Sequence, residues 1–250
     1  MAKQKSLIKL KGTIGDITFY KSADGFVARE KTTLDGSRIA TDPSFQRTRE
    51  NGQEFGRAGK AGKLLRDAFR TVVQASSDSK MVSRLTSAMI KVIQADAVNA
   101  RGLRNVIDGE AELLEGFEFN IQAPLQTILF APFSTSMDRT TGAISLTLPV
   151  FVPSNAMAAP TGATHFKIIA AGAAIDFENG NFIGEVQETA LLPMEQATTL
   201  QTLTTHVGAN TTHPLFLVVA IEFSQEVNGF HYPLKGSSYN ACTLVKVSGM

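Results

Sequence analysis

The chain has 250 residues, enough for one large hydrophobic core or two smaller ones, since domains usually contain roughly 100–150 residues. Hydrophobic residues make up 43% of the chain and charged residues 19%, which excludes extended disorder. The single cysteine, Cys242, excludes an intramolecular disulfide, and its β-like surroundings indicate a buried thiol.

The sequence gives no sign of export or membrane insertion. Lysines interrupt the N-terminal segment where a signal peptide needs an apolar core, and no apolar run approaches the roughly 18 residues of a membrane span. We therefore expect a protein that is cytoplasmic when synthesised, without membrane contact. In this interpretation it reaches the outside of the cell only in a released particle or filament.

Charge is distributed unevenly along the chain, although the net charge is only +1. Residues 1–107 contain twenty basic and ten acidic residues, a net +10, whereas residues 108–250 contain four basic and thirteen acidic residues, a net −9. The basic part could bind nucleic acid, attract the acidic part of the same molecule, or bind the acidic part of the next copy. We take 1–107 as a basic N-terminal region and 108–250 as an acidic domain.

Residues 7–31 have the pattern of a β-meander. Apolar residues alternate with Lys9 and Lys11, the period of a strand with one solvated face. Gly15-Asp16 and Ala23-Asp24-Gly25 are turn signals that divide the segment into strands. Because so small a meander is not stable alone, we expect it to pack against the rest of the chain or against another subunit.

Helices are predicted over about 43–97. Asp42-Pro43 is typical of a helix start, with a capping side chain before a proline. Two apolar stripes with helical spacing follow, separated by the cap-rich residues 76–79, and they predict an antiparallel helical hairpin. Glycines at positions 56, 59 and 62 indicate a close approach of the first helix to a neighbour.

Beyond about residue 112, short apolar or alternating runs replace the helical period. Turn formers separate them, among them Thr141-Gly142, Asn179-Gly180 and Asn228-Gly229. This pattern predicts an antiparallel, immunoglobulin-like β-sandwich, with the stretch 189–213 left undecided. The predicted fold class is therefore α+β, with an N-terminal β-meander and helical hairpin followed by the sandwich.

Motifs for catalysis or metal binding are not found. Residues 56–63 resemble a phosphate-binding loop, but Arg57 stands where that loop needs glycine and Leu64 where it needs serine or threonine. The four histidines, His165, His206, His213 and His231, are too far apart in sequence to indicate a ligand pair. We expect no enzymatic activity, no cofactor and no metal site.

Three motifs stand out in the basic region: 10–21 (LKGTIGDITFYK), 45–51 (FQRTREN), and 54–56 (EFG) with Ala61-Gly62-Lys63 and Arg66. They resemble an uncharacterised family of proteins of Bacteroidota and their phages, in which a glycine-rich β-opening and a basic helical segment precede a sandwich-like domain. The rest of the chain follows this family only in general pattern. The family has no assigned activity, so no functional residue carries over, but its association with phage-like elements implies a structural role.

We predict a self-assembling structural subunit of a phage-like or filamentous assembly, with copies of itself and other phage-like structural proteins as partners. The contact residues expected on the basic side are Lys9, Lys11, Arg47, Arg49, Arg57, Lys60, Lys63, Arg66 and Arg70. The acidic counter-surface is expected at Glu110, Glu112, Glu115 and Glu118. Two alternatives stay open: a nucleic-acid-associated module that uses the basic helix, and a receptor- or glycan-binding β-sandwich.

Overall fold

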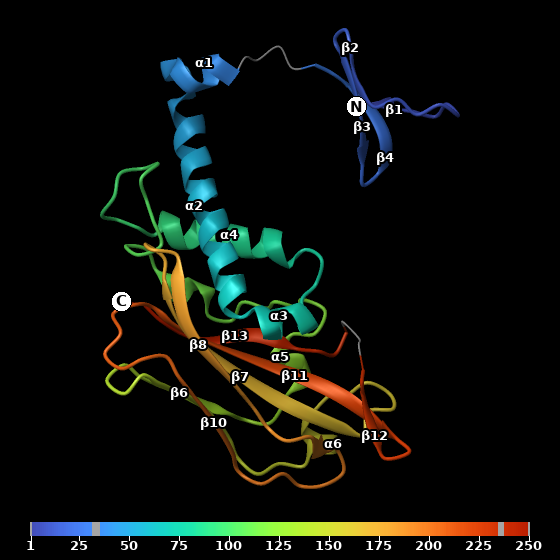
Figure 1. The fold of residues 1–250 in the computed structure, drawn as a ribbon, viewed down its shortest axis with the longest axis vertical. Helices are drawn as coiled ribbons and strands as arrows, with labels where there is room; N and C mark the ends of the chain where they lie inside the picture. The colour runs from blue at the N-terminus through green and yellow to red at the C-terminus, as the bar shows by residue number, and fades with distance from the viewer. Residues whose placement is uncertain (1, 32–35, 235–237, 250) are drawn as a thin grey trace. The chain divides into compact units, whose positions relative to one another are not determined.

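A computed structural model describes residues 2–31, 36–234 and 238–249 of the chain (Figure 1). The chain forms two compact units, Met1–Arg49 and Glu50–Met250. The charge boundary between residues 107 and 108 therefore lies inside the second unit. The boundary between the basic and acidic parts of the sequence thus differs from the boundary between the two compact units.

The first unit contains a four-stranded antiparallel sheet in the order β1-β4-β3-β2. The strands are β1 (Ala2–Lys3), β2 (Gly12–Ile14), β3 (Ile17–Ser22) and β4 (Gly25–Glu30). Gly15 has φ 56° in the β2–β3 turn, and Ser22 pairs with Gly25 across the β3–β4 turn, so both predicted turns are confirmed. A short α1 (Gly36–Thr41) and the 3-10 turn η1 (Pro43–Phe45) follow, and the Asp42 side chain caps η1 by accepting a 2.9 Å hydrogen bond from Ser44 N.

This first sheet has almost no core of its own. Of the described residues in the unit, only Val27 is buried. Its other apolar side chains include several large ones that are exposed within the unit: Leu7, Ile8, Leu10, Ile14 and Ile17. A small sheet without a buried face is at best marginally stable in water.

The next helices, of which the first begins in the first unit and continues into the second, confirm the predicted hairpin. They are α2 (Gln46–Ala68), α3 (Arg70–Ser76) and α4 (Met81–Gln94), and Phe69, with φ −108° and ψ 22°, breaks the helix between α2 and α3. Leu65, Leu85 and Met89 are fully buried on their facing sides, and each such side chain stabilises the fold by roughly 1.5–3 kcal/mol. Within the described residues, no helix combines the length and apolar character needed to cross a membrane.

Two antiparallel sheets form the rest of the second unit (Figure 1). The main sheet has the order β12-β11-β7-β8, with β13 paired to β11 and β9 paired to β7. Its strands are β7 (His165–Asp176), β8 (Asn181–Glu188), β9 (Leu192–Pro193), β11 (Leu215–Val227), β12 (Phe230–Pro233) and β13 (Cys242–Ser248). The smaller sheet, in the order β10-β6-β5, consists of β5 (Ser134–Asp138), β6 (Ala143–Leu148) and β10 (Gln201–His206). The connections contain η2 (Ala111–Leu114), α5 (Leu125–Ile128) and α6 (Pro153–Ala156).

The main sheet lies between the helices and the smaller sheet. Along β7, Ile169 and Ala171 pack against the helices, whereas Ile168 and Ala170 pack against the smaller sheet. The α+β class and the sandwich-like pairing of sheets are confirmed. The sequence did not predict that helices cover the second face of the main sheet, although the nearly continuous apolar runs of β7 and β11 are typical of strands buried on both faces.

The glycines of α2 do not all serve a close helix contact. A Cβ atom on Gly62 would lie 3.5 Å from Leu85 Cγ, but on Gly56 or Gly59 it would meet nothing within 4 Å. The predicted close approach is therefore wrong for these two residues.

We expect Gly59→Ala to raise the free energy of unfolding by about 1 kcal/mol, because alanine has the higher helix propensity. Thermal unfolding followed by circular dichroism measures the effect. Gly102→Ala is the contrasting control, since Gly102 has φ +86° and a Cβ there would lie 3.2 Å from Glu50 Cα. A lowered melting temperature for Gly59→Ala would show that a neighbour does occupy this helix face.

Candidate functional site

The predicted basic contact residues are divided between the two units. Lys9, Lys11, Arg47 and Arg49 belong to the first unit, and Arg57, Lys60, Lys63, Arg66 and Arg70 to the second. By sequence, the first unit has ten basic and five acidic residues, a net charge of +5, which leaves −4 for the second. The units therefore carry opposite net charges.

Several of these cations bind their own unit. Arg49 Nη1 donates to Ile39 O at 2.8 Å and to Asp42 O at 2.9 Å, and Lys9 Nζ donates to Gln4 O at 2.6 Å. Arg47 also has a partner. The hydrogen bonds of Arg49 and Lys9 lie within the first unit, so these two side chains have a structural role in addition to their charge.

Arg57 has a structural role in the second unit. Its Nη1 donates to the carbonyl of Gly102 and to that of Arg104 at 3.2 Å, and the buried Glu54 accepts from Gly102 N at 2.8 Å. Two side chains of α2 thus fix the loop that follows α4.

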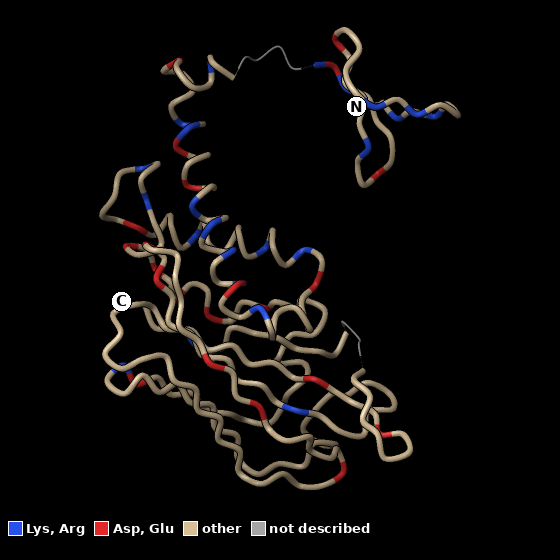
Figure 2. The backbone as a smooth tube through the Cα atoms, in the orientation of Figure 1, with Lys and Arg blue, Asp and Glu red and all other residues tan. Residues whose placement is uncertain are grey.

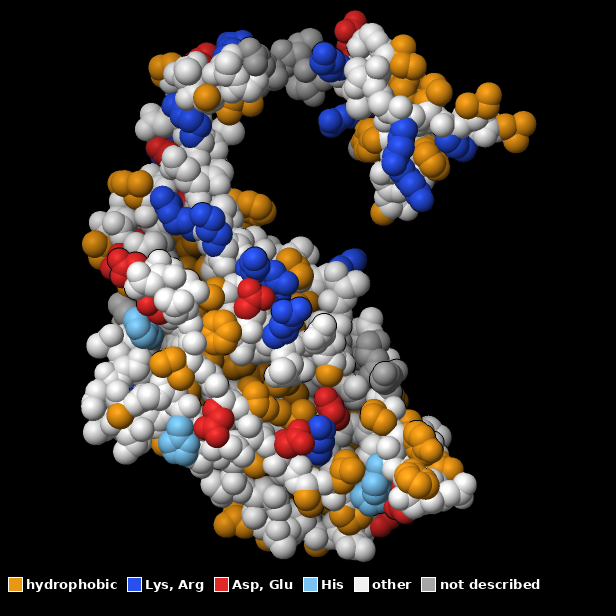
Figure 3. All heavy atoms as spheres, viewed as in Figure 1, with side chains coloured by type: hydrophobic (Ala, Val, Ile, Leu, Met, Phe, Trp, Pro, Cys, Tyr) orange, Lys and Arg blue, Asp and Glu red, His pale blue; other side chains and the backbone are white. Residues whose placement is uncertain are grey.

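The remaining four cations form a surface on α2 and the start of α3, which we call the basic surface: Lys60, Lys63, Arg66 and Arg70. Arg66 is half-buried and the other three are exposed. Within the described part of the chain, none of the four makes a side-chain hydrogen bond or an ion pair. In the second unit, Figures 2 and 3 show Lys and Arg concentrated along the helices and sparse on the sheets. The basic surface is therefore available to an external anionic partner.

A cleft of about 440 Å³ lies between α2 and the β7–β8 turn. Arg57, Lys60 and Lys63 line it together with Asp67 and Glu178. The two carboxylates therefore offset part of the positive charge of this cleft.

Three of the four carboxylates of the expected acidic counter-surface have partners within the chain. Glu112 Oε1 accepts from Gly249 N at 2.6 Å, and Glu115 Oε2 lies 3.3 Å from Lys246 Nζ. Glu118 is half-buried and accepts hydrogen bonds from Thr243 Oγ1 and from Leu125 N. Burial raises the pKa of Glu118, opposed by these hydrogen bonds and by the charge of Arg84. Among the four carboxylates, within the described residues, only Glu110 has no side-chain partner.

Other acidic side chains lie on the main sheet. Lys167 Nζ lies 2.8 Å from Glu188 Oε2 and 3.4 Å from Glu222 Oε2, an ion-pair group that spans β7, β8 and β11. Glu226 follows on β11, two residues beyond the buried Ser224. A single lysine in this group leaves this part of the sheet with excess negative charge.

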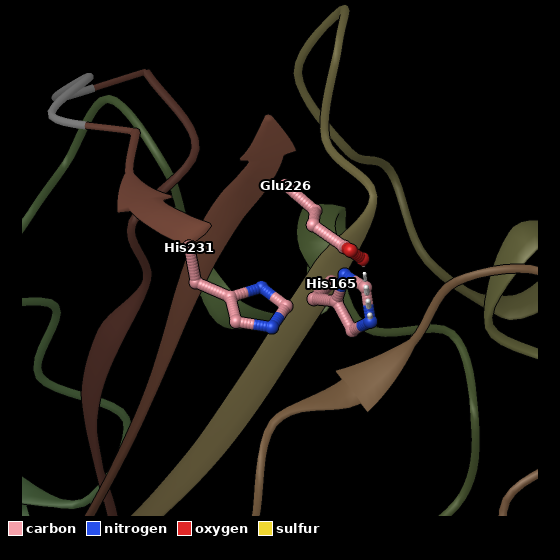
Figure 4. Close-up of side chains that lie close together, drawn as sticks. All are labelled: His165, Glu226 and His231. Carbon is pink, nitrogen blue, oxygen red and sulfur yellow. Dashed lines mark ion pairs between the residues drawn. The ribbon is translucent and has the colours of Figure 1, made fainter. Parts of the chain in front are cut away.

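Next to this group, two histidines and Glu226 form a cluster, which we call the histidine cluster (Figure 4). One potential ligand atom from each of His165, Glu226 and His231 lies within 4.8 Å of the others. His165 Nε2 is 3.9 Å from Glu226 Oε2, and the two imidazole rings meet edge to face with centroids 4.5 Å apart. His165 is half-buried, whereas Glu226 and His231 are exposed.

Strand register explains why the cluster forms. His165 on β7 pairs with Ser224 on β11, and Glu226, two residues further along β11, pairs with His231 on β12. Residues two apart on a strand share a face, so all four side chains belong to the same face of the main sheet. The spacing of the histidines in the sequence could not reveal this, because it requires the pairing of three strands. The one available signal was that His165 and His231 each fall in a run predicted as a strand.

Comparison with known proteins gives little further information. No protein-family model matches the sequence, and no curated protein matches it. One solved structure is similar, a chain from work on the pH-induced modulation of Streptococcus parasanguinis adhesion by Fap1 fimbriae. It is 13% identical, with a TM-score of 0.22, over 47% of this chain and 79% of that one.

Proposed function

We propose that this protein is a self-assembling structural subunit, in which the basic first unit of one copy binds the acidic second unit of another. The observation that carries the proposal is the near absence of a core in the first unit, where Val27 is the one buried side chain among the described residues. A folded sheet of this kind needs a surface that covers it. The opposite net charges of the units, +5 and −4, favour that surface on a second copy.

Burial of exposed apolar side chains would offset the cost of such a contact. Leu7, Ile8, Leu10, Ile14 and Ile17 are exposed within the unit, and full burial of each contributes roughly 1.5–3 kcal/mol. Their sum is comparable to the estimated cost of association, about 4–15 kcal/mol. The contact between basic and acidic units is head-to-tail, so it continues into a polymer unless it closes into a ring. The resemblance to phage-associated proteins supports a particle or filament as the product.

The assembly test uses Lys5→Glu/Lys11→Glu, a double variant in the first unit. Both side chains are exposed, and their reversal lowers the charge of that unit from +5 to +1. Light scattering coupled to size exclusion should give a mass above the 26.8 kDa monomer for the wild type, falling as salt is added. The double variant should be monomeric under the same conditions. A wild type that stays monomeric at all concentrations in low salt contradicts the proposal.

The basic surface favours a second candidate function, binding to nucleic acid through its phosphates. Its four cations lie three or four residues apart along α2 and the start of α3, and none has a side-chain partner within the described residues. Lys63→Glu/Arg70→Glu is the matched variant, because it reverses the same number of charges in the second unit. Loss of binding to random-sequence duplex DNA in this variant, with assembly intact, would assign the basic surface to a polyanion. If Lys5→Glu/Lys11→Glu loses assembly and Lys63→Glu/Arg70→Glu does not, the contact between copies is made by the first unit.

A further inference from the structure

We propose that His165, Glu226 and His231 bind a divalent transition-metal ion, with Zn²⁺ as the ion that best fits these ligands. Two imidazoles and one carboxylate form a known zinc ligand set, in which a fourth position stays open. Ligand atoms around tetrahedral zinc are about 3.3 Å apart, given bonds of about 2.0–2.1 Å. The three atoms lie within 4.8 Å of one another here. Changes in side-chain torsion that shorten each separation by about 1.5 Å or less would bring the atoms to the spacing of zinc ligands.

The hydrogen bonds of Thr164 prepare His165 for this role. Thr164 Oγ1 accepts from Glu226 N at 2.7 Å, and it lies 2.9 Å from His165 Nδ1 and 3.5 Å from Ser224 O. Metal binding through Nε2 requires the tautomer with the proton on Nδ1, which then donates to Thr164 Oγ1. A proton on Nδ1 leaves the lone pair on Nε2, the nitrogen that faces Glu226. A metal-binding histidine is commonly oriented through its other ring nitrogen in this way.

The charges around the cluster also favour a cation. Lys167, the cation of the neighbouring ion-pair group, binds Glu188 and Glu222 and is not paired with Glu226. Ser224, opposite His165 in the β7–β11 register, has a buried Oγ without a hydrogen-bond partner among the described residues. The cluster thus combines one carboxylate with two imidazoles, and Ser224 on the neighbouring strand position has a hydroxyl with unused hydrogen-bonding capacity. Glu226 and His231 are exposed, so an ion can enter from solvent.

Binding would add a side-chain link across β7, β11 and β12, which already pair through their backbones. β12 is exposed along its whole length and pairs with β11. A metal held by β7, β11 and β12 would link the β11–β12 hairpin to the neighbouring strand β7 through side chains. We therefore expect slower amide hydrogen exchange in residues 225–234 when the metal is bound.

The test uses the full-length chain without a purification tag, titrated with Zn²⁺ by calorimetry and with Co²⁺ by visible absorption. We expect one ion per chain, a raised melting temperature, and the Co²⁺ spectrum of a site with nitrogen and oxygen ligands. His231→Gln and Glu226→Gln change exposed side chains, so the fold should be retained, and each should weaken binding by at least about tenfold. His206→Gln is the matched control, because His206 is also exposed and beside a carboxylate, Glu185, but lies outside the cluster.

A second pair of variants tests Thr164 as a positioning residue. Thr164→Val should weaken Zn²⁺ binding by about tenfold, and Thr164→Ser, which keeps the hydroxyl, should restore it. The absence of Zn²⁺ binding in the wild type would overturn the proposal. So would binding that survives His231→Gln and Glu226→Gln unchanged, or that is lost equally in His206→Gln.

Discussion

Replacing Asp96 with alanine is expected to lower the free energy of unfolding by about 3 kcal/mol. Asp96 is buried just after α4, and its carboxylate accepts four hydrogen bonds of 2.8–3.0 Å: from the backbone of Val98, Asn99 and Asn105 and from Asn99 Nδ2. Alanine leaves these donors unpaired in the loop that also contacts Glu54 and Arg57. Chemical denaturation near neutral pH measures the loss.

The same residue predicts a dependence of stability on pH. Burial alone would raise the pKa of Asp96, but the hydrogen bonds from Asn99, Asn105 and Val98 outweigh it and lower the pKa from 3.8 to about 2. Because the folded value is the lower one, the stabilisation is complete above the unfolded pKa of 3.8 and is lost as the pH falls through about 2. Its size is on the order of 1–2 kcal/mol after allowance for solvent screening near the loop. Asp96→Asn should remove this pH dependence, and an unchanged acid-unfolding profile in that variant would contradict the assignment.

Gly172→Ala is expected to destabilise the second unit by about 1–3 kcal/mol through overpacking. Gly172 lies in β7 where the main sheet crosses the smaller one, and a Cβ there would stand 2.1 Å from Thr205 Oγ1 and 3.3 Å from Ile144 Cδ1. Thr205 is fully buried and its hydroxyl donates to Ile144 O, so it has little freedom to move. Thermal unfolding of the variant gives the size of the effect.

A double-mutant cycle separates this clash from other causes. Thr205→Ala removes the hydroxyl that the new methyl group would meet, so Gly172→Ala/Thr205→Ala should be more stable than the sum of the single effects predicts. Strict additivity would show that the two residues are not in contact, and that the packing of the sheets differs from that described here.

Local features of the fold were predictable because their causes are local. The Gly15-Asp16 turn, the Asp42 cap and the break between α2 and α4 each depend on a few neighbouring residues. The covering of the main sheet by helices was not predictable in the same way. It depends on which face of β7 meets which helix, and long-range packing of this kind is not encoded in periodicity alone.

For the candidate contact residues as well, local features were predictable from the sequence and long-range contacts were not. Sequence spacing correctly placed Lys60, Lys63 and Arg70 on an exposed helical surface. It could not distinguish them from Arg57, which binds loop carbonyls 45 residues or more away in sequence. The histidine cluster was missed altogether, because its residues come together only through the register of three strands.

Cross-linking of mixed copies tests most directly whether the first unit binds a neighbour. Light and ¹⁵N-labelled chains would be mixed in equal amounts, assembled at low salt, and treated with a carbodiimide that joins lysine amines to carboxylates at contact distance. We expect abundant light–heavy links between lysines of residues 2–31 and carboxylates of the Glu50–Met250 unit, and their loss in Lys5→Glu/Lys11→Glu. Links confined to chains of one isotope would mean that each first unit folds against its own chain, and would contradict assembly through this unit.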